Sequence, residues 1–232
     1  MRHIPNIITS LNLASGFIAV VFIMNGEPVT ASWIILAAML FDFLDGFASR
    51  LLHAYSDMGR ELDSLADVVS FGVAPGLMIY SLLSGEMVSS SLSGKIPAIA
   101  AAAIFPVCAG LRLAKFNTDT TQTVSFKGLP TPAAALAVVT VILSSAYSDS
   151  ALIRSFTASP VSVIIFSVVL SLLMVSRIPL LSLKFHDLKI RGNEGRYLLV
   201  LLTVAIAGIF RFDGIPWIIP VYVAVSLLSL LF

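Results

Sequence analysis

Charge and cysteine are the two features that this sequence has little of. Charged residues make up 12% of its 232 positions, about half the usual share in soluble domains, while 58% of the residues are hydrophobic. So few charged side chains cannot cover the surface of a soluble globule. The single cysteine, Cys108, excludes an internal disulfide, and its apolar neighbours indicate a packing role. The net charge of +1 indicates no partner by itself, and we expect no nucleic acid among the partners.

Long apolar runs take the place of the missing charge. Eight such segments can be marked, each near the length of about 20 residues that crosses a bilayer core of roughly 30 Å. They cover approximately residues 5–24, 31–52, 62–83, 96–115, 130–147, 160–177, 197–210 and 215–231. We therefore expect an all-α integral membrane protein with about eight transmembrane helices, folded as a single membrane domain over residues 1–232.

The positive residues are distributed unevenly between the two sides of such a bundle. With the N-terminus inside, 11 of the 14 Lys and Arg residues fall on the cytoplasmic side, and only Lys95, Arg154 and Arg211 fall on the other. Cytoplasmic loops of membrane proteins carry this excess of positive charge. The pattern predicts a multi-pass protein of the cell membrane whose two termini both face the cytoplasm.

Four aspartates stand out because they lie near the cytoplasmic ends of two consecutive predicted helices. Asp42 and Asp45 are three positions apart, and Asp63 and Asp67 are four apart, so each pair shares one helical face. The connecting turn is short, which allows the two faces to meet. Carboxylates gathered at a membrane boundary repel one another and are costly to desolvate, so cations must compensate them.

The ordinary alternative is that these aspartates form salt bridges at helix ends. The nearby bases are Arg50, His53 and Arg60, too few to neutralise four aspartates together with Asp57 and Glu61. Carboxylate oxygens favour hard divalent cations such as Mg²⁺ or Mn²⁺. Two such ions in one site are a common means of stabilising the attacking and leaving oxygens of a phosphoryl displacement. The sequence thus predicts a divalent metal site facing the cytoplasm.

The same residues carry a family resemblance. The pattern D-x2-D-G-x2-S-R-x8-G-x3-D-x3-D, which begins at Asp42 and ends at Asp67, resembles the signature of the CDP-alcohol phosphotransferases. Only Ser49 departs from it, since the family usually has alanine there. The resemblance implies a six-helix catalytic core, usually dimeric, with two metal ions held by Asp42, Asp45, Asp63 and Asp67. It further implies that Asp67 is the base that deprotonates the acceptor alcohol.

A second group of residues is expected to bind the CDP part of the lipid substrate. Gly46 lies four residues before Arg50, so a nucleotide could rest against the glycine with the guanidinium near its pyrophosphate. Asn6 and Thr9 belong to a polar stripe that continues through Asn12 and Gly16, and this stripe could instead join helices to one another. Two further candidates are Ser49 and Gly59, the second of which could be a simple turn glycine.

Several other segments narrow the resemblance to membrane-embedded phosphatidylserine synthases. They include the stretches around 5–16, 64–75, 112–117 and 126–132. For the acceptor or a phosphate, the candidate ligands are Arg112, Lys115, Asn117 and Lys127. The cations among them could also be positive-inside anchors without a binding role.

The resemblance implies transfer of the phosphatidyl group from CDP-diacylglycerol to L-serine, with CMP released. It also implies that the catalytic core covers about residues 1–177 and that additional C-terminal transmembrane helices cover about 195–232. The protein is further expected to form a homodimer in contact with membrane lipids. Two alternatives stay open. The acceptor could be glycerol 3-phosphate, inositol phosphate or another alcohol, or the carboxylates could mark the ion path of a cation-coupled transporter.

Overall fold

A computed structural model describes residues 3–87, 92–118, 126–181 and 193–229 of the chain. Within this part, ten α-helices follow one another, with a π-helical segment, η1, inserted after the third. Their bounds are α1 Ile4–Met24, α2 Pro28–Leu51, α3 Asp57–Asp67, η1 Val68–Val73, α4 Ala74–Met87, α5 Leu92–Thr118, α6 Thr131–Tyr147, α7 Ala151–Ala158, α8 Pro160–Val175, α9 Glu194–Phe210 and α10 Ile218–Leu228. Two 3₁₀ turns, η2 (Arg211–Asp213) and η3 (Ile215–Trp217), join α9 to α10. Two short strands, β1 (Phe126–Lys127) and β2 (Pro179–Leu180), pair antiparallel.

The predicted all-α membrane fold is confirmed, and each of the eight apolar segments lies mostly within helices. Five helical stretches are long and apolar enough to cross a membrane: 4–24, 28–51, 57–84, 95–118 and 194–213. A sixth span is possible if α6 and α7, which meet at a bend of 118°, are counted together. Helix α8 and the η3–α10 stretch are apolar but shorter. The number of eight spans therefore stays a prediction.

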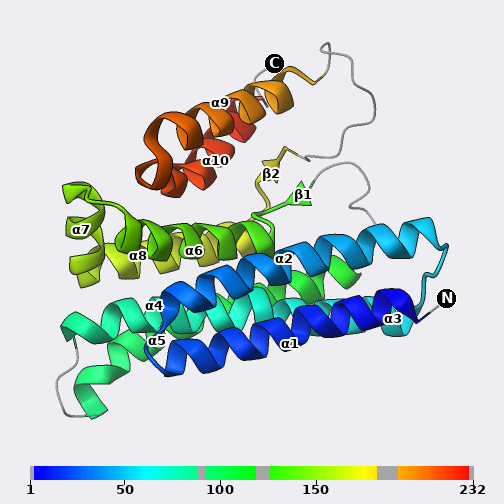
Figure 1. Cartoon of the computed structure of the whole chain (residues 1–232), viewed down its shortest axis with the longest axis horizontal. Helices are drawn as coiled ribbons and strands as arrows, with labels where there is room; N and C mark the ends of the chain where they lie inside the picture. The colour runs from blue at the N-terminus through cyan, green and yellow to red at the C-terminus, as the bar shows by residue number, and fades with distance from the viewer. Residues whose placement is uncertain (1–2, 88–91, 119–125, 182–192, 230–232) are drawn as a thin grey trace.

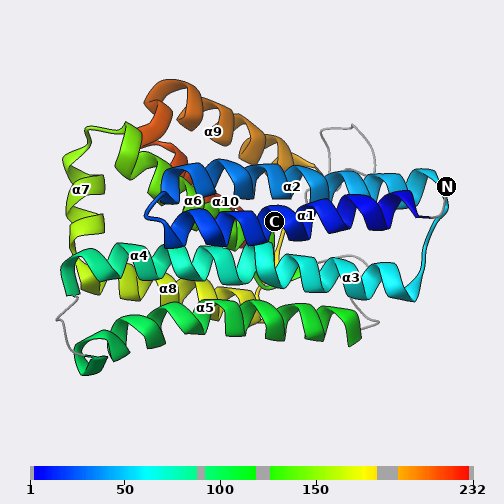
Figure 2. The ribbon, with the colours of Figure 1, turned by 60° about the horizontal axis from the view of Figure 1, so that its bottom comes forward.

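Helices α1 and α2, the continuous α3–η1–α4 stretch and α5 run roughly side by side along the length of the molecule (Figures 1 and 2). Helix α1 lies against α2 on one side and against α3 and η1 on another. Helices α6 and α8 form the next part of the bundle, and the α9–α10 pair lies beyond them (Figure 1). The start of α1 and the α2–α3 loop lie at one end of the molecule, and the β1–β2 pair lies nearer the middle, at the end of α6 that points the same way (Figure 1). The sequence assigns these segments to the cytoplasm, although the side of the membrane stays a prediction.

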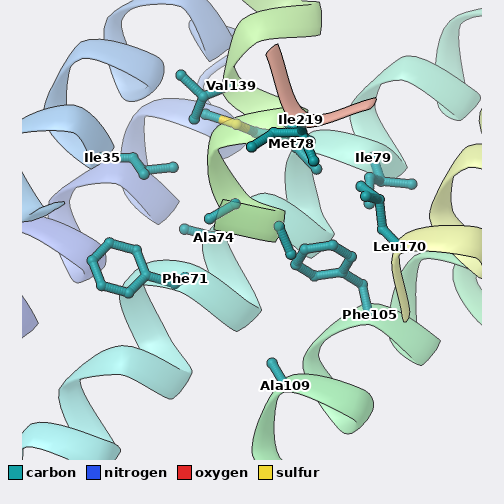
Figure 3. Close-up of a cluster of buried hydrophobic side chains, with 14 of the residues drawn as sticks. Ile35, Phe71, Ala74, Met78, Ile79, Phe105, Ala109, Val139, Leu170 and Ile219 are labelled. Carbon is teal, nitrogen blue, oxygen red and sulfur yellow. The ribbon is translucent and has the colours of Figure 1, made fainter. Parts of the chain in front are cut away.

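Buried apolar side chains from most of the helices form one core (Figure 3). Phe71 of η1, Met78 of α4 and Phe105 of α5 are fully buried there. Ile219 brings α10 into the same cluster. Because the core joins the first helices to the last, the C-terminal pair is packed as part of the bundle.

The closest approach between helices that matters for the site lies between α1 and η1. A Cβ atom on Gly16 would lie 2.3 Å from Ser70 Oγ and 2.8 Å from Ser70 Cα, so only glycine allows the two backbones to come this near. Small residues at helix contacts commonly permit such packing in membrane proteins. The Ser70 hydroxyl also donates a 2.9 Å hydrogen bond to the Asn12 carbonyl oxygen. Together these contacts hold α1 beside the helix that carries Asp67.

Candidate active site

Three of the four aspartates meet in space. Asp42 on α2 and Asp63 and Asp67 on α3 each offer a carboxylate oxygen, and these three oxygens lie within 4.8 Å of one another. The i, i+4 spacing places Asp63 and Asp67 on one face of α3, and packing of α2 beside that face adds Asp42. The helical-face argument from the sequence therefore predicted a real cluster.

Asp45 lies one turn further along α2 and is outside that group of three. It is 6% exposed and it lines the adjoining pocket together with Asp63. Thr9 on α1, whose hydroxyl donates to the Pro5 carbonyl over 3.0 Å, lies beside the Asp45 carboxylate. The sequence predicts Asp45 as a fourth metal ligand, and that role stays a prediction.

The buried oxygens at this place fit a cation better than a protein partner. Asp45 Oδ2 and Asp63 Oδ1 are both buried and accept no hydrogen bond within the described part of the chain. Buried carboxylate oxygens normally have partners, because leaving them unpaired is costly. A hard divalent cation accepts just such oxygen ligands. The four carboxylates are therefore a chemically suitable donor set for Mg²⁺ or Mn²⁺.

Asp67 has a defined partner on α1. The side-chain amide of Asn12 donates to Asp67 Oδ1 over 3.3 Å, and both residues are buried. The amide oxygen, Asn12 Oδ1, is buried and accepts no hydrogen bond from the residues that the structure describes. Immediately after Asp67 the helix widens into the π-helical segment η1, a distortion that occurs frequently at functional sites. The sequence placed Asn12 on a polar stripe but did not connect it to Asp67.

A pocket of about 440 Å³ opens beside the aspartates, between α1, α2 and the start of α3. It contains five of the six residues predicted to bind the CDP group: Asn6, Thr9, Gly46, Ser49 and Gly59. Gly59 is closely packed, since a Cβ there would lie 3.0 Å from Asn6 Oδ1. No atom lies within 4 Å of the position of a Cβ on Gly46, so that glycine leaves open space in the wall.

The sixth candidate, Arg50, is exposed and is not among the residues that line this pocket. Arg60 of α3 lines it instead, close to the carboxylates of Asp57 at 3.4 Å and Glu61 at 3.9 Å. Sequence reasoning treated Arg60 only as a neutralising base. Ser56 was also missed, although its hydroxyl accepts from the Gly59 amide and so caps α3. A serine three residues before Gly59, directly ahead of a helix that begins with an acidic residue, was the sequence signal for this cap.

Three of the four residues predicted for the acceptor lie near the end of α5. Arg112 donates to the Thr131 hydroxyl over 3.0 Å and interacts electrostatically with Asp67. Its Nε atom is buried and has no hydrogen-bond partner in the part of the chain that the structure describes. Arg112 and Lys115 line a second pocket of about 290 Å³, which the end of α8 completes. Two predicted acceptor ligands thus share one pocket.

The other two acceptor candidates lie outside this pocket or outside the described side chains. The Asn117 amide donates to the Ser64 hydroxyl over 2.9 Å and so joins α5 to α3. Lys127 belongs to β1, but its side chain lies outside the described part of the structure. Its neighbour Gly128 has φ +80°, and a Cβ there would lie 2.6 Å from the Met174 carbonyl oxygen. Glycine therefore allows the β1 loop to pass close to α8.

Comparison with known proteins agrees with this geometry. A CDP-diacylglycerol–serine O-phosphatidyltransferase of Bacillus subtilis is 37% identical over 186 residues, which cover 80% of this chain and 94% of the relative. A Helicobacter pylori protein of the same name is 32% identical over 233 positions, covering 98% and 91%. An archaetidylserine synthase of Methanothermobacter thermautotrophicus is 33% identical over 169 residues, covering 71% and 67%. The family model for CDP-alcohol phosphatidyltransferases matches residues 2–175, so the chain belongs to the CDP-alcohol phosphatidyltransferase family.

Proposed function

We propose that this protein transfers the phosphatidyl group from CDP-diacylglycerol to the hydroxyl of L-serine and releases CMP. The observation that carries the proposal is the meeting of Asp42, Asp63 and Asp67 beside a pocket lined by residues of the family pattern. Relatives that are 37% and 32% identical carry the name of this activity. Together the site and the relatives support an enzyme in preference to a cation carrier.

The reaction is a displacement at the lipid-linked phosphorus. The serine oxygen forms a new bond to that phosphorus, the bond from phosphorus to the CMP oxygen breaks, and CMP departs with the electron pair. The serine hydroxyl is a weak nucleophile, so a base must take its proton as it attacks. Asp67 is proposed for this role because it belongs to the carboxylate cluster and interacts electrostatically with Arg112. The proton that serine loses ends on the Asp67 carboxylate.

Other side chains bind and orient the reactants. Asn6, Thr9, Gly46, Ser49 and Gly59 are proposed to hold the cytidine and its phosphates in the 440 Å³ pocket, with Arg60 and Arg50 supplying positive charge. Asn12 keeps the Asp67 carboxylate in place. Two divalent cations, held by Asp42, Asp45, Asp63 and Asp67, would supply neutralisation of the phosphate charge.

Serine needs a cation for its own carboxylate. Arg112 and Lys115 share the 290 Å³ pocket, and Arg112 also interacts electrostatically with Asp67. We therefore place the acceptor at this end of α5, with the serine hydroxyl directed toward Asp67. Asn117 and Lys127 are proposed as further contributors.

The site is proposed to face the cytoplasm of the cell membrane, with both termini on the same side. This orientation follows from the 11-to-3 distribution of Lys and Arg. Reporter fusions after Gly85 should then give the external signal and fusions at Thr120 the cytoplasmic one. The opposite pair of signals would reverse the topology.

The extent of the catalytic core and the oligomeric state are also proposed from the family. The catalytic core corresponds to about residues 1–177, residues 195–232 add helices to it within the one membrane domain, and two copies form a homodimer surrounded by membrane lipids. Chemical crosslinking in native membranes followed by mass measurement checks the dimer. A band of monomer mass alone would contradict it.

The deciding experiment for the function is an acceptor screen. Purified protein in mixed micelles receives CDP-diacylglycerol, Mg²⁺ or Mn²⁺, and one of serine, glycerol 3-phosphate or inositol phosphate, and CMP release is followed. Serine alone should sustain release and yield phosphatidylserine. Release with a phosphorylated alcohol but not with serine would contradict the proposed acceptor while leaving the family assignment intact.

A further inference from the structure

A third hollow, of about 450 Å³, lies between the start of α6 and the α9–α10 pair. Leu199, Ile219 and Tyr222 are 5–7% exposed and form its buried floor. Val200 and Val204 of α9 line it as well and are 47% and 64% exposed, so they stand at its rim. The hollow thus has a closed base and an open edge along α9.

The chemistry of this hollow selects a hydrocarbon. Apart from Thr203 and the Tyr222 hydroxyl, its lining side chains are aliphatic or proline. The Tyr222 hydroxyl is already engaged, since it donates to the Leu181 carbonyl over 2.9 Å. Water in such a space would find few partners, whereas an apolar chain loses nothing on leaving the bilayer for it. The stretch 194–213, which contains α9, is apolar and long enough to span the membrane, so lipid chains have lateral access to the rim.

The hollow is also connected to the proposed reaction centre. Pro130 and Pro132, which line the hollow, flank Thr131, and the Thr131 hydroxyl accepts a 3.0 Å hydrogen bond from Arg112, which interacts electrostatically with Asp67. The Nε atom of Arg112 is buried and has no hydrogen-bond partner among the described residues, so it can donate to a phosphate or ester oxygen. Arg112 thus links the aspartate cluster to the apolar hollow. In a CDP-lipid the ester groups likewise lie between the phosphates and the acyl chains.

We infer that the hollow between α6, α9 and α10 binds one acyl chain of the CDP-lipid substrate, with Arg112 near the polar end of that chain. The inference rests on the proposed function, because it assigns the lipid part of the same substrate. Most of the wall comes from α9 and α10, which lie outside residues 2–175 that the family model matches. The C-terminal helices therefore act in lipid recognition.

The local structure holds this wall in place. The Ser226 hydroxyl accepts from the Leu181 amide over 3.2 Å, next to the Tyr222–Leu181 bond. Two residues of α10 thus fix the chain just after β2, and β2 pairs with β1 close to the start of α6. These hydrogen bonds and the strand pairing therefore hold together the elements that bound the hollow.

The first test fills the hollow. Val204→Trp places a large ring at the rim, and Leu201→Trp is the matched control because Leu201 lies on α9, is 66% exposed and does not line the hollow. CMP release is measured with long-chain and with six- to eight-carbon CDP-diacylglycerol. Val204→Trp should lower the long-chain preference in kcat/KM about tenfold, which corresponds to roughly two methylene groups losing their burial. The control should keep the wild-type preference, and an equal preference in all three proteins would overturn the inference.

A second test needs neither turnover nor a variant. CDP-diacylglycerol with a diazirine at the end of one acyl chain is bound to the wild-type protein without acceptor, irradiated, and the labelled peptides are sequenced. Label should appear in 130–136 or 199–222 and should fall when unlabelled CDP-diacylglycerol is added. Label confined to other helices, or equal labelling by a diazirine phosphatidylcholine that CDP-diacylglycerol does not displace, would overturn the inference. Failure of the serine reaction would leave this labelling result unchanged, so the two failures can be told apart.

Discussion

Asn12 on α1 and Asp67 at the end of α3 form a buried hydrogen bond across 55 positions of sequence, with the amide donating to Asp67 Oδ1 over 3.3 Å. A second contact reinforces it, because the Asn12 carbonyl accepts from Ser70, three residues after Asp67. Asn12 thereby joins helix α1 to the reaction centre through both its side chain and its backbone. The first predictions follow from this arrangement.

Replacing Asn12 with leucine keeps the approximate size of the side chain but removes the donor to Asp67. Hydrogen bonds to charged groups contribute about 1.5–3 kcal/mol, so we expect turnover to fall about tenfold or more. Binding of the CDP-lipid, measured with a labelled analogue, should change much less. Ser10→Ala is the control, because Ser10 is exposed on the same helix. An unchanged kcat in Asn12→Leu would show that the contact does not serve the reaction.

Asp67→Asn separates the base from the ligand. The amide keeps the shape of the side chain and one oxygen but cannot accept the serine proton at neutral pH. We expect kcat to fall by roughly 10²-fold or more, the scale of losing a general base. CDP-lipid binding should persist. If binding is lost together with turnover, Asp67 acts mainly as a metal ligand.

Gly16→Ala tests the close approach of α1 to η1. The added Cβ would lie 2.3 Å from Ser70 Oγ and 2.9 Å from Ser70 N, so α1 must shift and carry Asn12 away from Asp67. Overpacking of this kind costs about 1–3 kcal/mol, and thermal unfolding in detergent should occur at a lower temperature. Gly110→Ala is the matched control on α5, since no atom lies within 4 Å of its Cβ position. Equal melting temperatures for the two variants would contradict the predicted strain.

Metal dependence follows from the converging carboxylates and from the buried oxygens of Asp45 and Asp63 that accept no hydrogen bond from the described residues. EDTA should abolish CMP release, and Mg²⁺ or Mn²⁺ should restore it. Independently of activity, electron paramagnetic resonance of added Mn²⁺ should show bound ions in the wild type and weaker binding in Asp42→Asn and Asp63→Asn. Asp149→Asn is the control, because Asp149 is exposed and pairs with Arg154. Full turnover in excess EDTA would remove the metal from the mechanism.

The acceptor cations are tested by serine titration at saturating CDP-diacylglycerol. Loss of the cation that holds the serine carboxylate should raise the apparent KM for serine about tenfold or more, given about 1.5–3 kcal/mol for a charge-assisted contact. Arg112→Ala and Lys115→Ala should show the effect most strongly, since both line the same pocket. Lys127→Ala completes the series, and Lys95→Ala is the control near the start of α5. Unchanged serine dependence in the first three would place the acceptor elsewhere.

Much of this protein could be predicted from local sequence patterns. Apolar runs long enough to span a bilayer must satisfy their backbone groups internally, so the helical fold followed from composition and length. The spacing of Asp63 and Asp67 placed both on one face of a helix before any contact was known. The polar stripe of Asn6 and Thr9 likewise indicated a face of α1, and both residues line the pocket.

Tertiary packing decided which of these faces meet. The sequence treats four aspartates alike, yet Asp42 joins Asp63 and Asp67 while Asp45 turns toward the neighbouring pocket. Arg60 lines that pocket and Arg50 does not, because the direction of each side chain depends on how α2 and α3 pack rather than on distance along the chain. The Asn12–Asp67 bond joins α1 to α3 one helical turn from the close contact at Gly16. Helical periodicity is local and can be seen in the sequence, whereas the approach of distant helices is set by which side chains fit between them.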